Sequence, residues 1–374
     1  MTTITAPVTV PDELEHEGSR YRVTRAWPHR RGLAVELRRH GPDRAGNDHG
    51  APTGPIHAGL LHRGGDVEVY PHGEDPGLPA LAGVTGRLLS HRAGRRAVLD
   101  DGERFVKVVR PGTAGRVLDG AGRAAPLGSG YLLPRHRILG DGVVAIERVP
   151  GRPLISTAHD AESWARAWQL WESADAAVAD APGASPADAS GAAPRGGQGA
   201  RPAEPPATTV HDVAAEVAVL DGWAARIRTT LGTDLAAEAA VTAVTERLRA
   251  GADDDGPAVP AHRDLHDGQL LVSARAVALI DLDTACHAPA GLDLGNLLAH
   301  MTMHRTTGLL SDDGHARAAA AIRRRAEARG VGARRLAEWE RAALARLGLV
   351  FAVRPGSQRL AARLRRLSRE GATA

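Results

Sequence analysis

The sequence predicts an α+β protein with a β-rich N-terminal half and a mainly helical C-terminal half. Two observations support this. Short apolar stretches with alternating or β-branched residues, separated by turn residues, dominate up to about residue 150. From about residue 158 the apolar period becomes helical. With 374 residues, 43% of them hydrophobic, the chain can bury a sizeable core, which excludes disorder throughout.

The predicted strands share alternation or a β-branched and aromatic composition. They are Tyr21–Trp27, Leu33–Leu37, Asp66–Tyr70, Ala97–Leu99, Arg104–Val109 and a pair formed by Tyr131–Leu133 and Val143–Ile146. In Arg104–Val109 the alternation places Phe105 and Lys107 on one side of the pleat. Lys107 is the only lysine among 47 basic residues, and arginine's planar fork cannot replace a compact ammonium. Lys107 is therefore either required for its ammonium group or the chance survivor of a bias toward arginine.

The helical half begins with Trp164, Trp168 and Trp171 on one predicted helix face, a spacing typical of core packing. Residues 182–207 are rich in Pro, Gly, Ala and Ser without a large apolar residue, so we expect a disordered insertion. Helices are predicted again at about 210–231 and 234–250, and three or four more from 292 to the end.

The segment from residue 258 to 283 carries the distinctive chemistry. Two apolar strands, 269–272 and 276–280, are joined by a tight turn, and this hairpin brings the loop His262–Gln269 close to Asp281. Phosphoryl transfer requires a carboxylate that orients the acceptor hydroxyl and oxygen ligands for Mg²⁺. Asp264 has the position for the first task, and Gln269 and Asp281 have the position for the second.

These residues resemble the signature of the aminoglycoside phosphotransferase and choline kinase superfamily: His-x-Asp, an amide five residues after the Asp, a hairpin, and Ile-Asp. The resemblance runs from about residue 86 to 300 and implies a two-lobed protein-kinase-like fold. It also implies transfer of the γ-phosphate of ATP, with Mg²⁺, to a hydroxyl of a small molecule such as an aminoglycoside, a sugar or a related metabolite. The downstream segment 291–298 resembles the family's, which implies that Asp293 braces the catalytic loop.

The same resemblance assigns the nucleotide half of the site. Lys107 corresponds to the strand lysine that contacts ATP phosphates, and the turn at residues 90–99 to the hairpin that covers them. Residues 146–154 resemble the hinge, whose backbone at Glu147 and Val149 would bind adenine. The implied organisation is an N-terminal β-rich extension (1–85), a kinase N-lobe (86–150) and a helical C-lobe (151–374).

The sequence departs from the family pattern in three places. Gln269 replaces the usual Asn, a replacement that also resembles the maltokinase-like branch and keeps the amide oxygen. No Glu lies between residues 111 and 130 to pair with Lys107, and Asp119 is the only carboxylate there. The hairpin at residues 90–99 is poor in glycine. These departures motivate an alternative, a catalytically weak nucleotide-binding pseudokinase.

Other polar residues near the loop have simpler interpretations. His262 is expected to be structural, and His266 either lines the acceptor pocket or packs. Asp283 either assists the metal or caps the following turn. We interpret Asp267, the run Asp253–Asp255 and the arginine-rich C-terminal helices as solvated. His262, His266 and Asp281 also resemble a metal-dependent phosphohydrolase set, but that class has no use for a mid-strand lysine.

Composition limits the remaining classes. Cys286 is the single cysteine, which excludes an intramolecular disulfide. The formal charge is only +3 and acidic residues interleave with arginine, so no nucleic-acid partner is expected. No long apolar run and no secretory start occur in the sequence, so we expect a cytoplasmic protein with no membrane partner.

Overall fold

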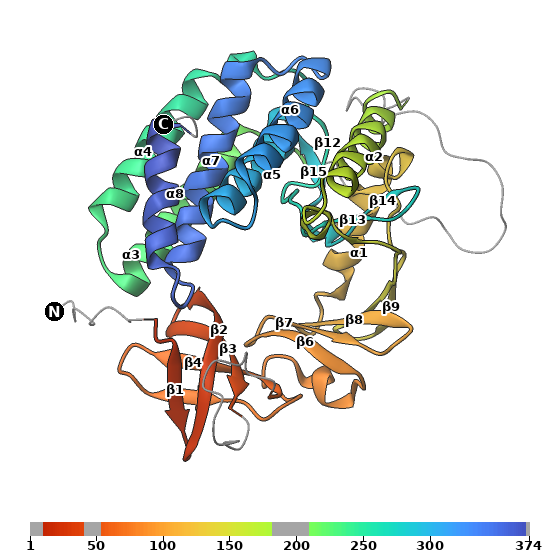
Figure 1. Ribbon diagram of the computed structural model, residues 1–374. Helices are drawn as coiled ribbons and strands as arrows, with labels where there is room; N and C mark the ends of the chain where they lie inside the picture. The colour runs from red at the N-terminus through yellow and green to blue at the C-terminus, as the bar shows by residue number, and fades with distance from the viewer. Residues whose placement is uncertain (1–9, 41–53, 182–208, 372–374) are drawn as a thin grey trace.

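The structure, a computed structural model, describes residues 10–40, 54–181 and 209–371. The strands of the N-terminal half gather at one end of the molecule, and most helices gather at the other end together with a few short strands (Figure 1). This arrangement confirms the expected α+β, two-lobed fold. The insertion expected at 182–207 lies outside the described residues.

The N-terminal half contains two five-stranded antiparallel sheets. The first is a meander in the order β1-β2-β3-β4-β5, with bounds Glu13–His16, Ser19–His29, Gly32–Arg39, Ile56–His62 and Val67–Val69. The second has the order β6-β7-β8-β10-β9, with bounds Arg87–Arg92, Arg96–Asp100, Arg104–Val109, Val143–Glu147 and His136–Gly140. Lys107 lies in the central strand β8, where it pairs with Val98 on one side and Val144 on the other.

The predicted strand at Tyr131–Leu133 is wrong. Pro134 cannot donate a backbone hydrogen bond and ends the extended run, so the strand that pairs with β10 is β9 instead. Leu132 makes only an isolated bridge to Ala278 in the helical half, with hydrogen bonds to Val277 and Leu279. This stretch therefore joins the two lobes instead of extending the sheet.

The helical half packs around two apolar clusters. Helix α1 (Ala114–Arg123) lies between β8 and β9 of the N-terminal half. The helices of the helical half are α2 Ala161–Ala179, α3 Val213–Leu231, α4 Leu235–Ala250, α5 Ala290–Thr306, α6 Asp312–Ala328, α7 Ala333–Ala352 and α8 Gln358–Glu370. In one cluster the first sheet packs against α3, α4 and α7. In the other the three tryptophans of α2 lie buried with α5, α6 and the strand pair of the catalytic segment, which confirms core packing for Trp164, Trp168 and Trp171.

Short strands hold the chemical segment against this core. β13 (Leu270–Val272) and β14 (Val277–Leu279) form the expected hairpin, and β11 (Arg152–Pro153) adds to its edge. β12 (Val259–Ala261) pairs with β15 (Cys286–Ala288), so the two ends of the segment lie side by side. The loop between β12 and β13 and the short helix η5 (Leu282–Thr284) are thereby brought to one place.

Two surface interpretations are also corrected. Asp255 is not a solvated loop residue: both its carboxylate oxygens accept hydrogen bonds from Arg335, at 2.8 and 2.5 Å, and Arg335 is only 2% exposed. In the C-terminal helices, Arg325 and Arg329 bind the buried Asp175 at the end of α2. Part of the arginine content therefore ties helices together. None of the helices in the described ranges is long and apolar enough to cross a membrane.

Candidate active site

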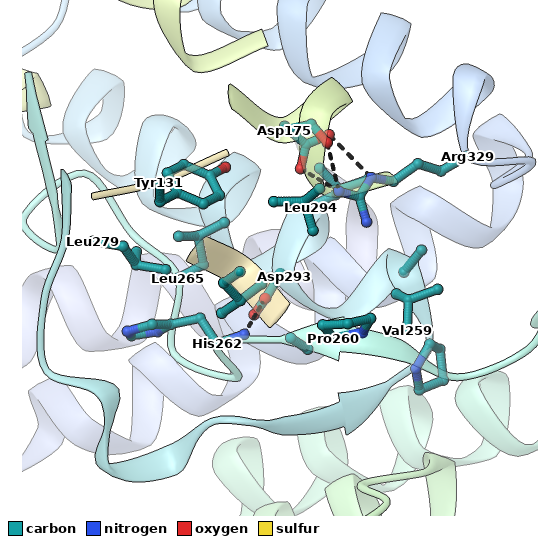
Figure 2. A pocket seen from close by; sticks show the side chains of 15 residues that line it. Tyr131, Asp175, Val259, Pro260, His262, Leu265, Leu279, Asp293, Leu294 and Arg329 are labelled. Atoms are coloured by element: carbon teal, nitrogen blue, oxygen red, sulfur yellow. Dashed lines mark hydrogen bonds and ion pairs between the residues drawn. The ribbon is translucent and has the colours of Figure 1, made fainter. Parts of the chain in front are cut away.

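The loop His262–Gln269 is held from behind by one buried carboxylate. Asp293, in the first turn of α5, accepts hydrogen bonds from the backbone N–H groups of His262 (2.6 Å) and Arg263 (2.8 Å). Figure 2 shows Asp293 pointing at the loop. Burial raises the pKa of Asp293, and the two backbone donors and the nearby His262 act against that rise. The site's geometry thus depends on a carboxylate that does not face the substrate side.

The neighbouring contacts fix the loop further. The His262 ring shares a hydrogen bond, through Nε2, with the carbonyl of Ile280 at 2.9 Å, and the Asn296 side chain donates to the carbonyl of Leu265 at 2.8 Å. Arg263 adopts a left-handed backbone with φ 71°, an unfavourable conformation for a residue with a side chain. The bonds around it hold this conformation, which turns the next residue, Asp264, outward.

The cavity in Figure 2 lies behind this loop and is not a substrate site. It is lined by Tyr131, Asp175, His262, Asp293 and Arg329 among others, and its volume is about 20 Å³. That space is about the size of one water molecule. The reactive side of the loop is therefore the opposite one, toward β8.

Lys107 reaches across from the second sheet to the segment that follows β14. Its Nζ lies 3.0 Å from Oδ1 of Asp281 and 2.5 Å from Oδ2 of Asp283. Burial opposes ionisation of Asp281, but Lys107 and Arg96 outweigh it and lower the pKa of Asp281 to about 2. Asp281 also has a left-handed backbone, φ 59°. The structure thus joins the lysine and both carboxylates in one charged cluster, while Asp119 lies exposed on α1.

Asp264 stands between solvent and a buried arginine. Its side chain is 45% exposed, and its Oδ1 accepts a hydrogen bond from Arg346 of α7 at 3.2 Å. Arg346 is in turn fixed by the Asn296 side-chain oxygen at 2.6 Å. The second carboxylate oxygen of Asp264 accepts no hydrogen bond within the described part of the chain, so it remains available to a ligand.

Gln269 is the other oxygen donor expected at the metal. Its backbone carbonyl accepts a hydrogen bond from Ile280 at 3.1 Å, which places Gln269 beside the residue that precedes Asp281. The side chain is half-buried, and no hydrogen bond engages its amide within the described ranges. An ionised carboxylate and an uncommitted amide oxygen at the neighbouring ends of β13 and β14 fit a hard cation such as Mg²⁺.

The first sheet positions the β6–β7 hairpin that the sequence placed over the phosphates. Glu36 of β3, 5% exposed, accepts a hydrogen bond from the backbone N–H of His91 at 2.8 Å. Asp75 accepts another from the backbone N–H of Gly94 at the hairpin turn, at 2.7 Å, and binds the His91 ring at 2.9 Å. The region before residue 86 therefore anchors this hairpin.

At the proposed hinge, the two residues differ. The backbone N–H of Glu147 already donates to the carbonyl of Arg135 at 2.9 Å, and its carboxylate forms an exposed ion pair with the same arginine. The backbone of Val149 makes no hydrogen bond in the part of the chain that the structure describes. Of the two, Val149 is the one with a free backbone donor.

His266, within the loop His262–Gln269, packs against α5. The ring of His266 stacks on His300 of α5, with centroids 4.5 Å apart and an interplanar angle of 9°. The next residue, Asp267, is not solvated as expected: it is 4% exposed and binds His304 at 2.9 Å. Only the fold reveals this contact, because α5 lies more than 20 residues further along the sequence.

Comparison with known proteins identifies the chain's relatives. The sequence model of the phosphotransferase enzyme family matches residues 95–339, which include both Lys107 and the loop with Asp264. The chain belongs to this phosphotransferase family. It is therefore a small-molecule kinase, as the resemblance implied. No curated protein in the comparison matches it.

Solved structures similar to this kinase include three kinds of enzyme. An aminoglycoside phosphotransferase from Streptomyces rimosus is 17% identical, with a TM-score of 0.47, covering 71% of this chain and 96% of that one. A choline/ethanolamine kinase family protein from Mesorhizobium loti is 16% identical, with a TM-score of 0.44, covering 79% of this chain and 88% of that one. A macrolide 2'-phosphotransferase from Brachybacterium faecium is 20% identical, with a TM-score of 0.40, covering 74% of this chain and 86% of that one. At these TM-scores the likeness says nothing about the substrate.

Sequence reasoning missed several residues that shape the site. Arg346 holds Asp264 but lies on a helix more than 80 residues away, among many other arginines. Glu36 and Asp75 anchor the hairpin from a region that matched no known motif. A signal existed only for Asn296, which falls in the family-like segment 291–298.

Proposed function

We propose that this family member transfers the γ-phosphate of ATP to a hydroxyl of a small molecule, with Asp264 as the group that orients the hydroxyl. The observation that carries the proposal is the charged cluster of Lys107, Asp281 and Asp283 next to the braced loop. In-line phosphoryl transfer needs a cation for the phosphates, carboxylates for the metal and a further carboxylate that orients the acceptor hydroxyl. Lys107, the pair Asp281 and Asp283, and the exposed Asp264 on the braced loop match these three needs. The acceptor class remains an aminoglycoside, a sugar or a related metabolite, and we propose a cytoplasmic enzyme.

Asp264 is suited to receive the acceptor hydroxyl. Arg346 donates a hydrogen bond to Oδ1 and so fixes the direction of the carboxylate, while Oδ2 accepts no hydrogen bond within the described ranges. The hydroxyl would donate to Oδ2 and give up its proton there as its oxygen bonds to the γ-phosphorus, while the bond from that phosphorus to the β-phosphate oxygen breaks and ADP leaves. Fixed orientation of this kind lowers the barrier without any movement of the loop.

Asp281 and Gln269 are suited to hold Mg²⁺, with Asp283 beside them. A bound Mg²⁺ would supply charge neutralisation for the phosphates. Asp281 is ionised at neutral pH because its pKa is about 2. Lys107 pairs with both Asp281 and Asp283, and we propose that its ammonium moves to the phosphates when nucleotide binds. Adenine would then meet the free backbone donor of Val149.

The two alternative functions are less compatible with the contacts. A phosphohydrolase would need His262 as a metal ligand, but its Nε2 is engaged by the Ile280 carbonyl and its backbone by Asp293. A pseudokinase is motivated by the missing helix Glu, but Lys107 is held by Asp281 and Asp283. The lysine is thus kept beside the proposed metal ligands without a helix Glu.

The test is a screen for transfer with pooled acceptors. Purified protein, Mg²⁺ and γ-labelled ATP or GTP are incubated with pools of aminoglycosides, sugars and other hydroxyl metabolites, and labelled products are counted. We expect transfer to at least one pool, and loss of nucleotide binding by calorimetry in Lys107→Ala. Absence of transfer to every pool would favour the pseudokinase, and unchanged ATP affinity in Lys107→Ala would refute the role of the lysine.

A further inference from the structure

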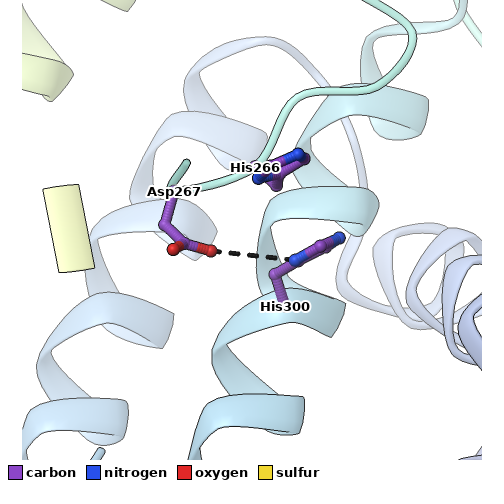
Figure 3. A group of neighbouring side chains, drawn as sticks. All are labelled: His266, Asp267 and His300. Carbon is purple, nitrogen blue, oxygen red and sulfur yellow. Dashed lines mark ion pairs between the residues drawn. The ribbon is translucent and has the colours of Figure 1, made fainter. Parts of the chain in front are cut away.

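A buried carboxylate beside the catalytic loop is surrounded by histidines. The side chain of Asp267 is 6% exposed, and its Oδ1 lies 2.9 Å from Nε2 of His304 and 3.7 Å from Nδ1 of His300. Figure 3 shows Asp267 pointing from the loop toward His300 on the helix, with His266 above the same ring. Within the described ranges no Lys or Arg lies at ion-pair distance from Asp267. Its charge is thus faced by imidazoles alone.

The positions of these residues are those of a chelating set. His300 and His304 are four residues apart on α5 and therefore lie on one helix face. The loop supplies Asp267 and His266 from the opposite side, and the potential ligand atoms of His266, Asp267 and His300 all lie within 4.8 Å of one another. His300 makes no hydrogen bond of its own in the described part of the chain, although its side chain is only 13% exposed.

The distances suit a tetrahedral ion. Zinc–nitrogen and zinc–oxygen bonds of roughly 2.0–2.1 Å place neighbouring ligand atoms about 3.3 Å apart in a tetrahedron. The separations from Asp267 to His304 and to His300 are 2.9 and 3.7 Å, so they lie on either side of that value. Small side-chain rotations would equalise them.

The surroundings of the cluster also suit a metal. Arg346 is engaged by Asp264 and Asn296, so it does not compete with a cation for Asp267.

We propose that His266, Asp267 and His300 bind a transition-metal ion of the Zn²⁺ type, with His304 at the fourth position. His266 now accepts a hydrogen bond from the Gly268 backbone through Nδ1 at 3.0 Å, so it would have to release that bond to join. The site differs from the proposed magnesium site, because imidazole favours zinc and cobalt whereas magnesium prefers oxygen. A bound ion would cross-link α5 to the loop that carries Asp264.

The contacts have a second explanation, in which the His304–Asp267 hydrogen bond is only a structural link. The two explanations are separated by calorimetric titration of chelator-treated, nucleotide-free protein with ZnCl₂. We expect one ion per chain and a rise in Tm on binding. His300→Gln leaves the His304–Asp267 bond in place, so the variant should fold, yet its affinity for Zn²⁺ should fall at least tenfold, and the double variant His300→Gln/His304→Gln at least a hundredfold.

Three controls define the site. His159→Gln removes an exposed histidine elsewhere and should leave Zn²⁺ binding unchanged. Asp281→Asn removes the proposed magnesium ligand and should also leave it unchanged, which separates this proposal from the proposed kinase function. Co²⁺ should give the visible absorption of a tetrahedral complex in the wild type and lose it in the double variant. No Zn²⁺ uptake by the wild type, or equal affinity in His300→Gln, would overturn the proposal.

Discussion

Asp293→Asn measures how far the catalytic loop depends on one buried carboxylate. Asp293 accepts two backbone hydrogen bonds, from His262 and Arg263. Hydrogen bonds to charged groups contribute roughly 1.5–3 kcal/mol each. Asparagine keeps one acceptor oxygen but turns an NH₂ toward the other N–H, so one bond is lost. Because burial disfavours the charge and raises the pKa of Asp293, removing that charge recovers part of the loss.

The net cost is therefore about 1–3 kcal/mol of unfolding free energy, equivalent to a fall in Tm of roughly 1–4 °C in a chain of this size. The larger effect is expected in turnover, because Arg263 would relax from its left-handed backbone and displace Asp264. We expect kcat to fall by about tenfold or more, with little change in the affinity for ATP.

The assay combines thermal unfolding with steady-state kinetics on the acceptor found by the screen. The matched control is Asp119→Asn, which removes a carboxylate that is exposed on α1 and should change neither Tm nor kcat. An Asp293→Asn variant with wild-type Tm and wild-type kcat would refute the idea that this carboxylate holds the loop.

Three further predictions concern the surroundings of the site. Arg335→Met removes the buried partner of Asp255 and should lower the unfolding free energy in urea by about 3–5 kcal/mol, since it leaves an unpaired buried charge. Glu36→Gln weakens the anchor on the backbone of His91, so KM for ATP should rise severalfold while kcat changes little; an unchanged KM would refute the anchoring role. Burial lowers the pKa of His315 to about 4, so the unfolded state takes up its proton first as pH falls from 6.5 toward 4, and stability is lost there. His315→Gln should flatten that part of the stability curve, and an identical curve would contradict the assignment.

Much of the fold was predictable because its patterns are local. The alternation of Arg104–Val109 and the hairpin after Gln269 depend on neighbours in sequence, and both appear as strands. The Tyr131–Leu133 strand failed because a contact with Ala278, distant in sequence, outweighed local propensity.

The candidate site divides in the same way. The carboxylates were predictable because they belong to a sequence motif, and the lysine because it is the only lysine in the sequence. Their partners were not: Arg346, Glu36 and His304 reach the site from distant elements, and only three-dimensional packing shows which of many arginines, acids and histidines do so. The Lys107 contacts with Asp281 and Asp283 also became visible only in the structure.

The division of labour between Asp264 and Asp281 is the central claim, and binding and transfer must be measured separately to test it. Asp264→Asn should leave the affinity for Mg·ATP nearly intact, because Asp264 lies outside the charged cluster around Lys107, but slow phosphoryl transfer by a factor on the order of 10² or more. Asp281→Asn should weaken Mg²⁺-dependent nucleotide binding at least tenfold, because it removes an ionised ligand.

The decisive measurement is Mg·ATP affinity by calorimetry alongside ³²P transfer for Asp264→Asn, Asp281→Asn and the wild type under identical conditions. The account predicts that only Asp281→Asn loses Mg·ATP affinity, while Asp264→Asn binds Mg·ATP like the wild type and fails to transfer. Equal loss of nucleotide affinity in both variants, or undiminished transfer in Asp264→Asn, would contradict it.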